Sequence, residues 1–262
     1  MLTFSCGFCL YNLSCHIMWQ KSIRRFFTNI VCGFVYSKDG RKKLRVVLNS
    51  PVLEYVHFIR ADTGLRMPRL RFFVGYQARS LLIGVNNRWI YKFPLRRDNY
   101  RELALREQRI IRALAPISSI PIPDVHLIEY KGMLVRKYDF VGGATLRTAP
   151  RDLIMANMGV LAAPVARFLY ELAQADPVEI RDLKPSPDAA PGYMRGWCQG
   201  DICDNFMIDL KTMKIKAFID WEDARFCDFA YMFGCEKRSP AREFMDAVRK
   251  EYDRLWNANN KS

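Results

Sequence analysis

Two carboxylates and one amide flank a predicted β-hairpin in the second half of the chain. Asp201 and Asn205 precede its first strand, at residues 206–210, and Asp220 directly follows its second strand, at residues 215–219. A hairpin brings the start of one strand next to the end of the other, so the three side chains are predicted to meet at one end of the two strands. A polar turn between two edge strands would show the same residues, and spacing alone leaves both interpretations open.

Phosphoryl transfer from a nucleotide uses this combination of groups. Magnesium prefers oxygen ligands from carboxylates and amides, and the attacking hydroxyl needs a carboxylate facing it. On this interpretation Asp220 is the main metal ligand, Asn205 is the second ligand, and Asp201 orients the acceptor hydroxyl or accepts its proton.

The stretch at 197–231 also resembles the aminoglycoside phosphotransferase and choline kinase family, which has a protein-kinase-like fold. Members carry His-Gly-Asp, an Asn a few residues later, and then Ile-Asp-Trp with a trailing Asp. The matching residues here are Gln199–Gly200–Asp201, Asn205, Ile219–Asp220–Trp221 and Asp228. The resemblance implies an enzyme that uses ATP and Mg²⁺ to phosphorylate a hydroxyl, with Asp228 bracing the loop.

Two positions depart from the family pattern. Gln199 stands where the family has His, which concerns the hydrogen-bond scaffold of the loop more than its chemistry. Asn205 follows Asp201 by four residues, where the family and the protein kinases usually have five. Both departures favour the alternative of a catalytically weak pseudokinase or nucleotide-binding scaffold.

A Lys in an apolar strand is the predicted phosphate ligand. Strands are predicted at residues 71–76, 81–85 and 88–93, and Lys92 lies in the third, within Ile-Tyr-Lys-Phe-Pro. A buried Lys is costly unless it meets an anion, although an edge-strand Lys facing water is the alternative. Gly75 and Ser80 lie in the turn between the first two strands. Gly75 alone is a weak signal of a glycine-rich loop, and Ser80 is predicted to donate a hydrogen bond to a phosphate.

A helix predicted at residues 98–115, with Asp98 as its cap, follows this strand. In kinases a Glu on this helix pairs with the strand Lys and holds it against the phosphates. Glu107 and Glu102 both qualify as the partner of Lys92. The Arg-Glu pair of the resembled family, matched at Arg106–Glu107, favours Glu107, and a salt-bridged surface Glu is the alternative for both.

A second hairpin at 125–138 completes a predicted five-stranded sheet. The run at 137–143 then reads as a hinge, where the extended backbone of Asp139 and Val141 is predicted to bind an adenine edge. The paired glycines at 142–143 fit a simple loop equally well. Helices are predicted at 157–175 and 240–256, with a loop at 176–196 between the first of them and the catalytic stretch.

These elements predict an α+β, two-lobed, protein-kinase-like fold. Its N-lobe, at 69–141, is a five-stranded antiparallel sheet with one long helix, and its mainly helical C-lobe, at 142–262, carries the catalytic hairpin. Residues 1–68 form a basic extension. The acceptor of the phosphoryl group is predicted to be a sugar, amino sugar or choline-like hydroxyl, with a cell-surface glycan precursor as one option.

The extension carries much of the chain's formal charge of +14. Apolar residues recur at helical spacing over 18–34 with bases between them, and residues 38–45 read as a basic loop with a turn at Asp39–Gly40. Residues 18–45 are therefore a predicted contact for an anionic membrane surface, although a solvated face or packing on the domain would give the same pattern. Nucleic acid is a less favoured partner because interleaved stacking aromatics are lacking.

Eight scattered Cys residues do not read as a disulfide framework, which predicts a reducing cytoplasm. Cys6, Cys9 and Cys15–His16 make a poor tetrahedral zinc clamp. The opening residues 1–19 are too interrupted to span a bilayer and lack the features of a signal peptide, so residues 1–17 are interpreted as an upstream extension or a disordered segment. The predicted location is cytoplasmic, with peripheral contact at the inner face of the membrane.

Overall fold

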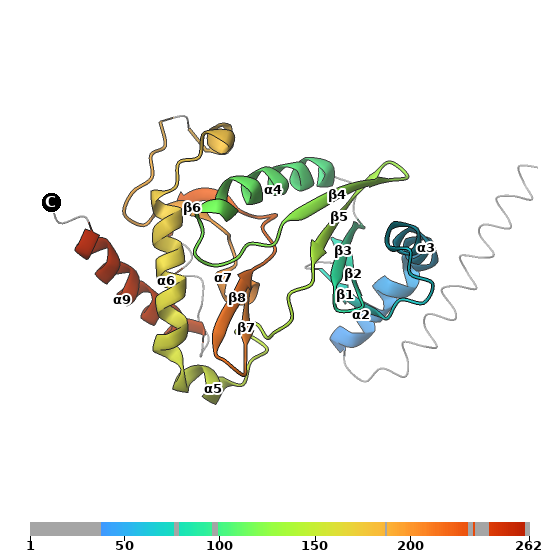
Figure 1. Cartoon of the computed structure of the whole chain (residues 1–262), viewed down its shortest axis with the longest axis horizontal. Helices are drawn as coiled ribbons and strands as arrows, with labels where there is room; N and C mark the ends of the chain where they lie inside the picture. The colour runs from blue at the N-terminus through green and yellow to red at the C-terminus, as the bar shows by residue number, and fades with distance from the viewer. Residues whose placement is uncertain are drawn as a thin grey trace, which may run out of the picture. The chain divides into compact units, whose positions relative to one another are not determined.

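The computed structural model of the chain describes residues 38–75, 79–95, 99–186, 188–229, 233 and 241–259 (Figure 1). The amphipathic helix predicted at 18–34 and the residues interpreted as an upstream extension lie outside these ranges, and the structure leaves those predictions as they stand. Asp98, the predicted cap of the helix at 98–115, also lies outside them, but the structure describes the cap position of that helix, which is Asn99.

The predicted five-stranded antiparallel sheet is confirmed, with strand order β1-β2-β3-β5-β4. Both tight turns use left-handed backbone, at Asn86 and Asn87 (φ 53° and 54°) and at Lys131 and Gly132 (φ 48° and 73°). Asn and Gly tolerate this region, and such turns match the twist of a hairpin. The strands are β1 (Leu70–Val74), β2 (Ser80–Val85), β3 (Trp89–Pro94), β4 (Val125–Tyr130) and β5 (Met133–Asp139).

The chain divides into two compact units, and β3 contributes to both. The first comprises Met1–Asn86 and Lys92–Arg97. In it, α3 (Val52–Thr63) packs through Tyr55, whose ring stacks on Phe93 of β3 with centroids 4.0 Å apart. The preceding helix α2 (Lys38–Asn49) neighbours β1.

The predicted basic loop at 38–45 is wrong, because these residues belong to α2. The run is rich in Lys, Arg and Leu, which favour helix. Leu44, Val47 and Leu48 also follow the i, i+3, i+4 spacing of one helical face. A local Asp-Gly turn signal did not outweigh these preferences.

The second unit comprises Asn87–Tyr91 and Asp98–Ser262. Its helix α4 (Tyr100–Leu114) packs beside β4 and β5. The N-cap position of α4 is Asn99, in left-handed backbone (φ 46°), and no side chain caps the helix, so the predicted start at residue 98 is corrected. The remaining elements are η2 (Ala115–Ile117), α5 (Arg151–Ala156), α6 (Met158–Gln174), η3 (Val178–Leu183), β6 (Arg195–Cys198), α7 (Ile202–Asn205), β7 (Phe206–Asp209), β8 (Lys214–Phe218), β9 (Arg225–Asp228) and α9 (Ala241–Asn259).

The core of the second unit forms around α6, which lies against α9 and β8 (Figure 1). Phe168 on α6 stacks on Phe218 of β8 with centroids 4.3 Å apart, and both rings are fully buried. The helix also approaches β6 so closely that a Cβ at Gly196 would lie 2.5 Å from the carbonyl oxygen of Leu172. This packing fixes β6, and so the start of the loop that carries Asp201.

Among the residues that the structure describes, no helix combines the length and apolar character needed to cross a bilayer. The predicted membrane contact of residues 18–45 falls largely outside the described ranges and stays a prediction.

Candidate active site

The predicted catalytic hairpin is present as β7 and β8. Phe206 pairs with Phe218, and the N–H of Ile219 donates to the carbonyl oxygen of Asn205 at 2.7 Å. Asn205 is the last residue of the four-residue helix α7, which stands where a loop was predicted. The residue before Asp220 is therefore hydrogen-bonded directly to Asn205.

Gln199 connects Asp201 to the same place. Its side chain is almost fully buried, and its Nε2 donates to the carbonyl oxygens of Ile219 at 3.0 Å and Asp220 at 2.6 Å. Its Oε1 accepts from the backbone N–H of Asp201 at 3.0 Å. One buried amide thus holds the backbones of Asp201 and Asp220 together, in the position where the resembled family has His.

The backbone at Asp220 is in the left-handed region, with φ 60°. A residue other than Gly pays a conformational cost there, and it persists where the surrounding structure determines it. Gln199 supplies that support by binding the Asp220 carbonyl. On the facing loop Gly200 has φ 105°, and a Cβ there would meet the carbonyl oxygen of Asp223 at 3.4 Å. The two loops are in contact.

The oxygen-bearing side chains of this site reach the surface. Asp201 and Asp220 are exposed and Asn205 is half-buried. Within the described ranges, no three His, Cys, Asp or Glu residues form a group that could hold a metal ion. Mg²⁺ in nucleotide enzymes is usually held by one or two carboxylates together with substrate phosphates rather than by a protein cage. The proposed donor set, the carboxylate of Asp220 and the amide of Asn205, fits that mode of binding.

Glu107 on α4 is completely buried in a charged cluster. Nη1 of Arg136 on β5 lies 2.6 Å from Glu107 Oε2 and 2.8 Å from Glu222 Oε2. The hydroxyl of Tyr138 donates to the Glu107 carboxylate at 3.0 Å. Burial raises the pKa of Tyr138 well above its usual value, and the charge of Glu107 raises it further. Glu107 is therefore a charge-paired buried carboxylate rather than a surface one.

Arg136 and Glu222 were missed in the sequence, although a signal for Arg136 was present. Arg136 directly follows two apolar residues of the same strand, Leu134 and Val135, which are both buried. The argument that a charge in an apolar strand must meet a counter-charge was applied to Lys92 and holds equally for Arg136. Burial lowers the pKa of its guanidinium, but Tyr138, Glu107 and Glu222 together raise it well above its ordinary value.

Lys92, Gly75 and Ser80 belong to the first unit. Lys92 is 3 % exposed and Ser80 is 4 % exposed. The N–H of Gly75 donates to the carbonyl oxygen of Ser80 at 2.9 Å, and a Cβ at Gly75 would lie 2.4 Å from Ser80 Oγ. The turn therefore closes tightly at Gly75, where any side chain would have to displace the Ser80 hydroxyl. The pairing of Lys92 with Glu107 and the phosphate contacts of Gly75 and Ser80 stay predictions.

The predicted hinge leaves β5 at Asp139, which is exposed, and continues through the half-buried Val141. It then meets the hairpin, because Ala144 and Ile208 exchange two backbone hydrogen bonds of 2.9 and 2.7 Å. A Cβ at Gly143 would lie 2.6 Å from the carbonyl oxygen of Ile208. At least the second of the paired glycines is required by this close approach. The adenine contacts of Asp139 and Val141 stay predictions.

Solved structures share the fold of this chain. No protein-family model and no curated protein sequence matches the chain significantly. Among solved structures, the GDP complex of aminoglycoside 2'-phosphotransferase-IIIa matches with TM-score 0.60 and 19% identity, covering 79% of this chain and 84% of that one. The streptomycin and ATP ternary complex of APH(2'')-IIa matches with TM-score 0.59 and 17% identity, covering 78% and 84%. The chain has the fold of the aminoglycoside phosphotransferases.

Asp228, which the family pattern suggests as a brace for the loop, is the last residue of β9 and pairs with Arg195. The opposite end of this ladder, at Cys198 and Arg225, adjoins the loop of Asp201. The hydrogen bonds described above that brace the loop come from Gln199. Bracing by Asp228 stays a prediction.

Replacing Gln199 with Leu is expected to destabilise the second unit by about 1–3 kcal/mol. Leu keeps most of the buried volume but leaves the Asp201 N–H and the Asp220 carbonyl without their side-chain partner. Urea unfolding curves of the two proteins measure the difference. Gln199→Glu keeps the acceptor for Asp201 but loses the donor and puts a buried negative charge against the carbonyl oxygens of Ile219 and Asp220, so it should cost at least as much as Gln199→Leu. Equal unfolding midpoints for Gln199→Leu and the unchanged protein would contradict this role.

Cys227 is expected to be the most readily alkylated of the three cysteines in the described ranges. A hydrogen bond from Cys198, aided by Arg225, lowers the pKa of Cys227 to about 7. Cys227 is half-buried, whereas Cys198 and Cys203 are buried. Because the thiolate is the nucleophile, alkylation by iodoacetamide should accelerate as the pH rises through about 7. Peptide mapping after timed alkylation checks this, and modification of Cys203 before Cys227 would refute it.

Proposed function

We propose that the chain is an ATP- and Mg²⁺-dependent phosphotransferase that acts on a hydroxyl of a small molecule. The observation that carries the proposal is the buried amide of Gln199, which holds the loops of Asp201 and Asp220 together on a phosphotransferase fold. Two loops joined in this way support the proposal, because phosphoryl transfer requires a metal-binding carboxylate and a base carboxylate within one site.

The residues of the second unit have distinct tasks in this mechanism. Asp220 and Asn205 would hold magnesium, which neutralises the charge that develops on the transferred phosphoryl group. The carboxylate of Asp201 would face the acceptor hydroxyl, orient it and take its proton as the bond from the hydroxyl oxygen to the γ-phosphorus forms and the bond from the γ-phosphorus to the bridging oxygen breaks, which releases ADP. Gln199 would keep the two loops in register through its three hydrogen bonds to their backbones.

Nucleotide binding would also use the first unit and the hinge. Lys92 would orient the phosphates and Glu107 would hold Lys92. The backbone of Asp139 and Val141 would bind the nucleobase, and Gly75 and Ser80 would cover the phosphates. The solved structures name both ATP and GDP as ligands of their proteins, so the preference between adenine and guanine nucleotides belongs in the test.

The acceptor is proposed to be an amino sugar, sugar or choline-like alcohol. Streptomycin and gentamicin are named as ligands of APH(2'')-IIa, a protein to which this chain is similar in fold at 17% identity. Both are amino sugar compounds with hydroxyl groups. A cell-surface glycan precursor is also proposed as an acceptor. Residues 18–45 are proposed to contact an anionic membrane surface, with the protein in the cytoplasm at the inner face of the membrane.

Thermal-shift titration with ATP and GTP, each with and without Mg²⁺, tests the proposal first. We expect stabilisation by nucleotide that increases when Mg²⁺ is present. Transfer of labelled phosphate from ATP to a panel of amino sugars, sugars and choline then identifies the acceptor. Absence of any nucleotide-dependent shift would remove the proposal.

A pseudokinase or nucleotide-binding scaffold is the second candidate, and one observation favours it. Asp201 and Asn205 are separated only by the short helix α7, which keeps their spacing at four residues. Asn205 then reaches the metal less directly than in a kinase with the usual spacing of five. Nucleotide binding without phosphate transfer to any acceptor, and without slow ATP hydrolysis, would support this candidate.

A further inference from the structure

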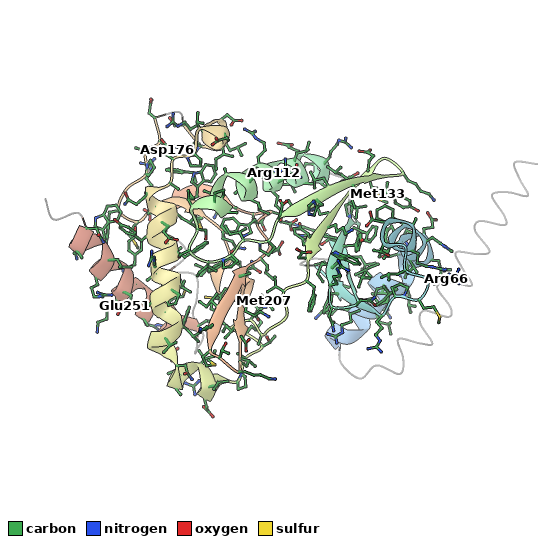
Figure 2. All side chains as sticks on the ribbon, in the orientation of Figure 1. Arg66, Arg112, Met133, Asp176, Met207 and Glu251 are labelled. Atoms are coloured by element: carbon green, nitrogen blue, oxygen red, sulfur yellow. The ribbon has the colours of Figure 1, made fainter. Side chains whose placement is uncertain are left out.

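The segment from Asp220 to Ala224 is held from two sides, and the mechanism above uses only one of them. On one side Gln199 binds the carbonyls of Ile219 and Asp220. On the other side the segment is tied to helix α4 and strand β5. In Figure 2 the labels Arg112 and Met133 mark where these two elements lie. This second attachment has no role in the chemistry described so far.

Two Arg residues make the attachment to α4. Arg106 on α4 donates from Nη2 to the carbonyl oxygen of Ala224 at 2.6 Å. Arg136 on β5 uses one nitrogen, Nη1, to contact Glu107 Oε2 at 2.6 Å and Glu222 Oε2 at 2.8 Å. Arg136 therefore joins a carboxylate of α4 to a carboxylate two residues beyond Asp220.

Burial makes this junction rigid. The side chains of Arg136 and Glu107 are 4% and 0% exposed, and that of Glu222 is 18% exposed. Water competes poorly for such groups, and charged hydrogen bonds at 2.6–2.8 Å are at the strong end of the observed range. By contrast, Arg101 of α4 pairs with Glu129 of β4 at an exposed position, where both side chains are 55% exposed.

We propose that Arg136 is a positioning residue, which fixes the metal-binding segment around Asp220 to the carboxylate of Glu107 through Glu222. The proposal rests on the proposed function in assigning metal binding to Asp220. Asp220 holds a left-handed backbone (φ 60°), which persists only under support from its surroundings. Glu222 and Gln199 anchor the residues on either side of it, so loosening one anchor frees the Asp220 carboxylate from the geometry that a metal requires.

The first test measures the segment without any ligand. Amide hydrogen exchange is followed by mass spectrometry in the peptide that covers residues 219–224, in the unchanged chain and in Arg136→Lys. Lys keeps the charge beside Glu107, but its ammonium is a point charge on a shorter arm, so it cannot bridge the two carboxylates in the same way. We expect exchange in this peptide to accelerate about tenfold, with α6 and β6 unchanged.

Arg101→Lys is the matched control, because it makes the same chemical change on α4 at the exposed pair with Glu129. It should leave exchange at 219–224 as in the unchanged chain. Unaltered exchange at 219–224 in Arg136→Lys would overturn the proposal. Equal acceleration in α6, β6 and 219–224 would also overturn it, because Arg136 would then support the whole unit and not this segment.

The second test uses Glu222→Ala, which removes the far anchor and leaves the Glu107–Arg136 pair intact. ADP binding is measured by calorimetry in the absence of Mg²⁺ and across a Mg²⁺ titration. We expect ADP affinity without Mg²⁺ to be unchanged and the Mg²⁺ concentration for half-maximal enhancement to rise about tenfold, which corresponds to 1.4 kcal/mol. Equal Mg²⁺ requirements in both proteins would overturn the proposal.

The two tests separate this inference from the proposed function. If the unchanged chain binds no nucleotide, the proposed function fails and the exchange measurement still decides whether Arg136 holds the segment. If nucleotide binds with Mg²⁺ but neither Arg136→Lys nor Glu222→Ala alters exchange or Mg²⁺ requirement, the positioning role fails and the proposed function stands.

Discussion

Asp201→Asn is expected to lower the rate of phosphoryl transfer by about two to four orders of magnitude, while nucleotide binding persists. Asn has the size of Asp but cannot accept the proton of the acceptor hydroxyl, and loss of a general base typically costs that much. The loop should keep its shape, since Gln199 contacts the backbone N–H of Asp201 and not its carboxylate. Turnover of labelled ATP with the acceptor found in the panel measures the effect.

Two comparisons make this prediction specific. Asp220→Ala should remove the Mg²⁺ dependence of nucleotide binding, which Asp201→Asn should retain, because Asp220 is proposed as a metal ligand and Asp201 is not. Asp209→Asn changes a carboxylate at the other end of β7, where Oδ1 accepts from the N–H groups of Lys211 and Thr212. Asn keeps that acceptor, so turnover should be unaffected. Full activity in Asp201→Asn would exclude Asp201 as the base.

The parts of the fold that follow from local signals could be predicted from the sequence. Short-range sequence patterns predict the hairpin of β7 and β8 and the turn at Asn86–Asn87, and the structure has both. Helix α4 was predicted with its Glu107, although its start moved by two residues because the cap position falls on Asn99. Local chemistry sets an element more reliably than it sets the first residue of that element.

Interactions between residues distant in the chain could not be predicted in the same way. Arg136 and Glu222 are separated by 86 positions, and nothing local marks Glu222 as the partner of a buried Arg. Gln199 looked like a loss relative to the family His, yet its amide can donate and accept at once, and the structure uses both capacities. The fold, and not the motif, determines which carbonyls lie within reach of a side chain.

Arg136→Met is expected to destabilise the second unit by about 3–5 kcal/mol, the typical cost of removing one partner from a buried ion pair. Glu107 is fully buried, and its remaining partner among the described residues of this unit would be the Tyr138 hydroxyl, which cannot neutralise a carboxylate. Met fills most of the volume of Arg, so the loss comes from the uncompensated charge and not from a cavity. Urea unfolding at pH 7 measures the change, with Arg101→Met at the exposed pair as the matched control.

The double variant Arg136→Met/Glu107→Met decides whether that loss comes from the unpaired charge. Replacing both members of a buried pair with apolar groups is often nearly neutral, so stability should recover substantially relative to Arg136→Met. Recovery should stop short of the unchanged chain, because the Tyr138 hydroxyl loses its acceptor and an unsatisfied buried group costs about 1–3 kcal/mol. Mg²⁺-dependent nucleotide binding should stay impaired in the double variant, since Glu222 is no longer tied to α4. If the double variant were less stable than Arg136→Met, the pair would contribute packing that apolar side chains cannot replace, and the unpaired charge would not explain the loss.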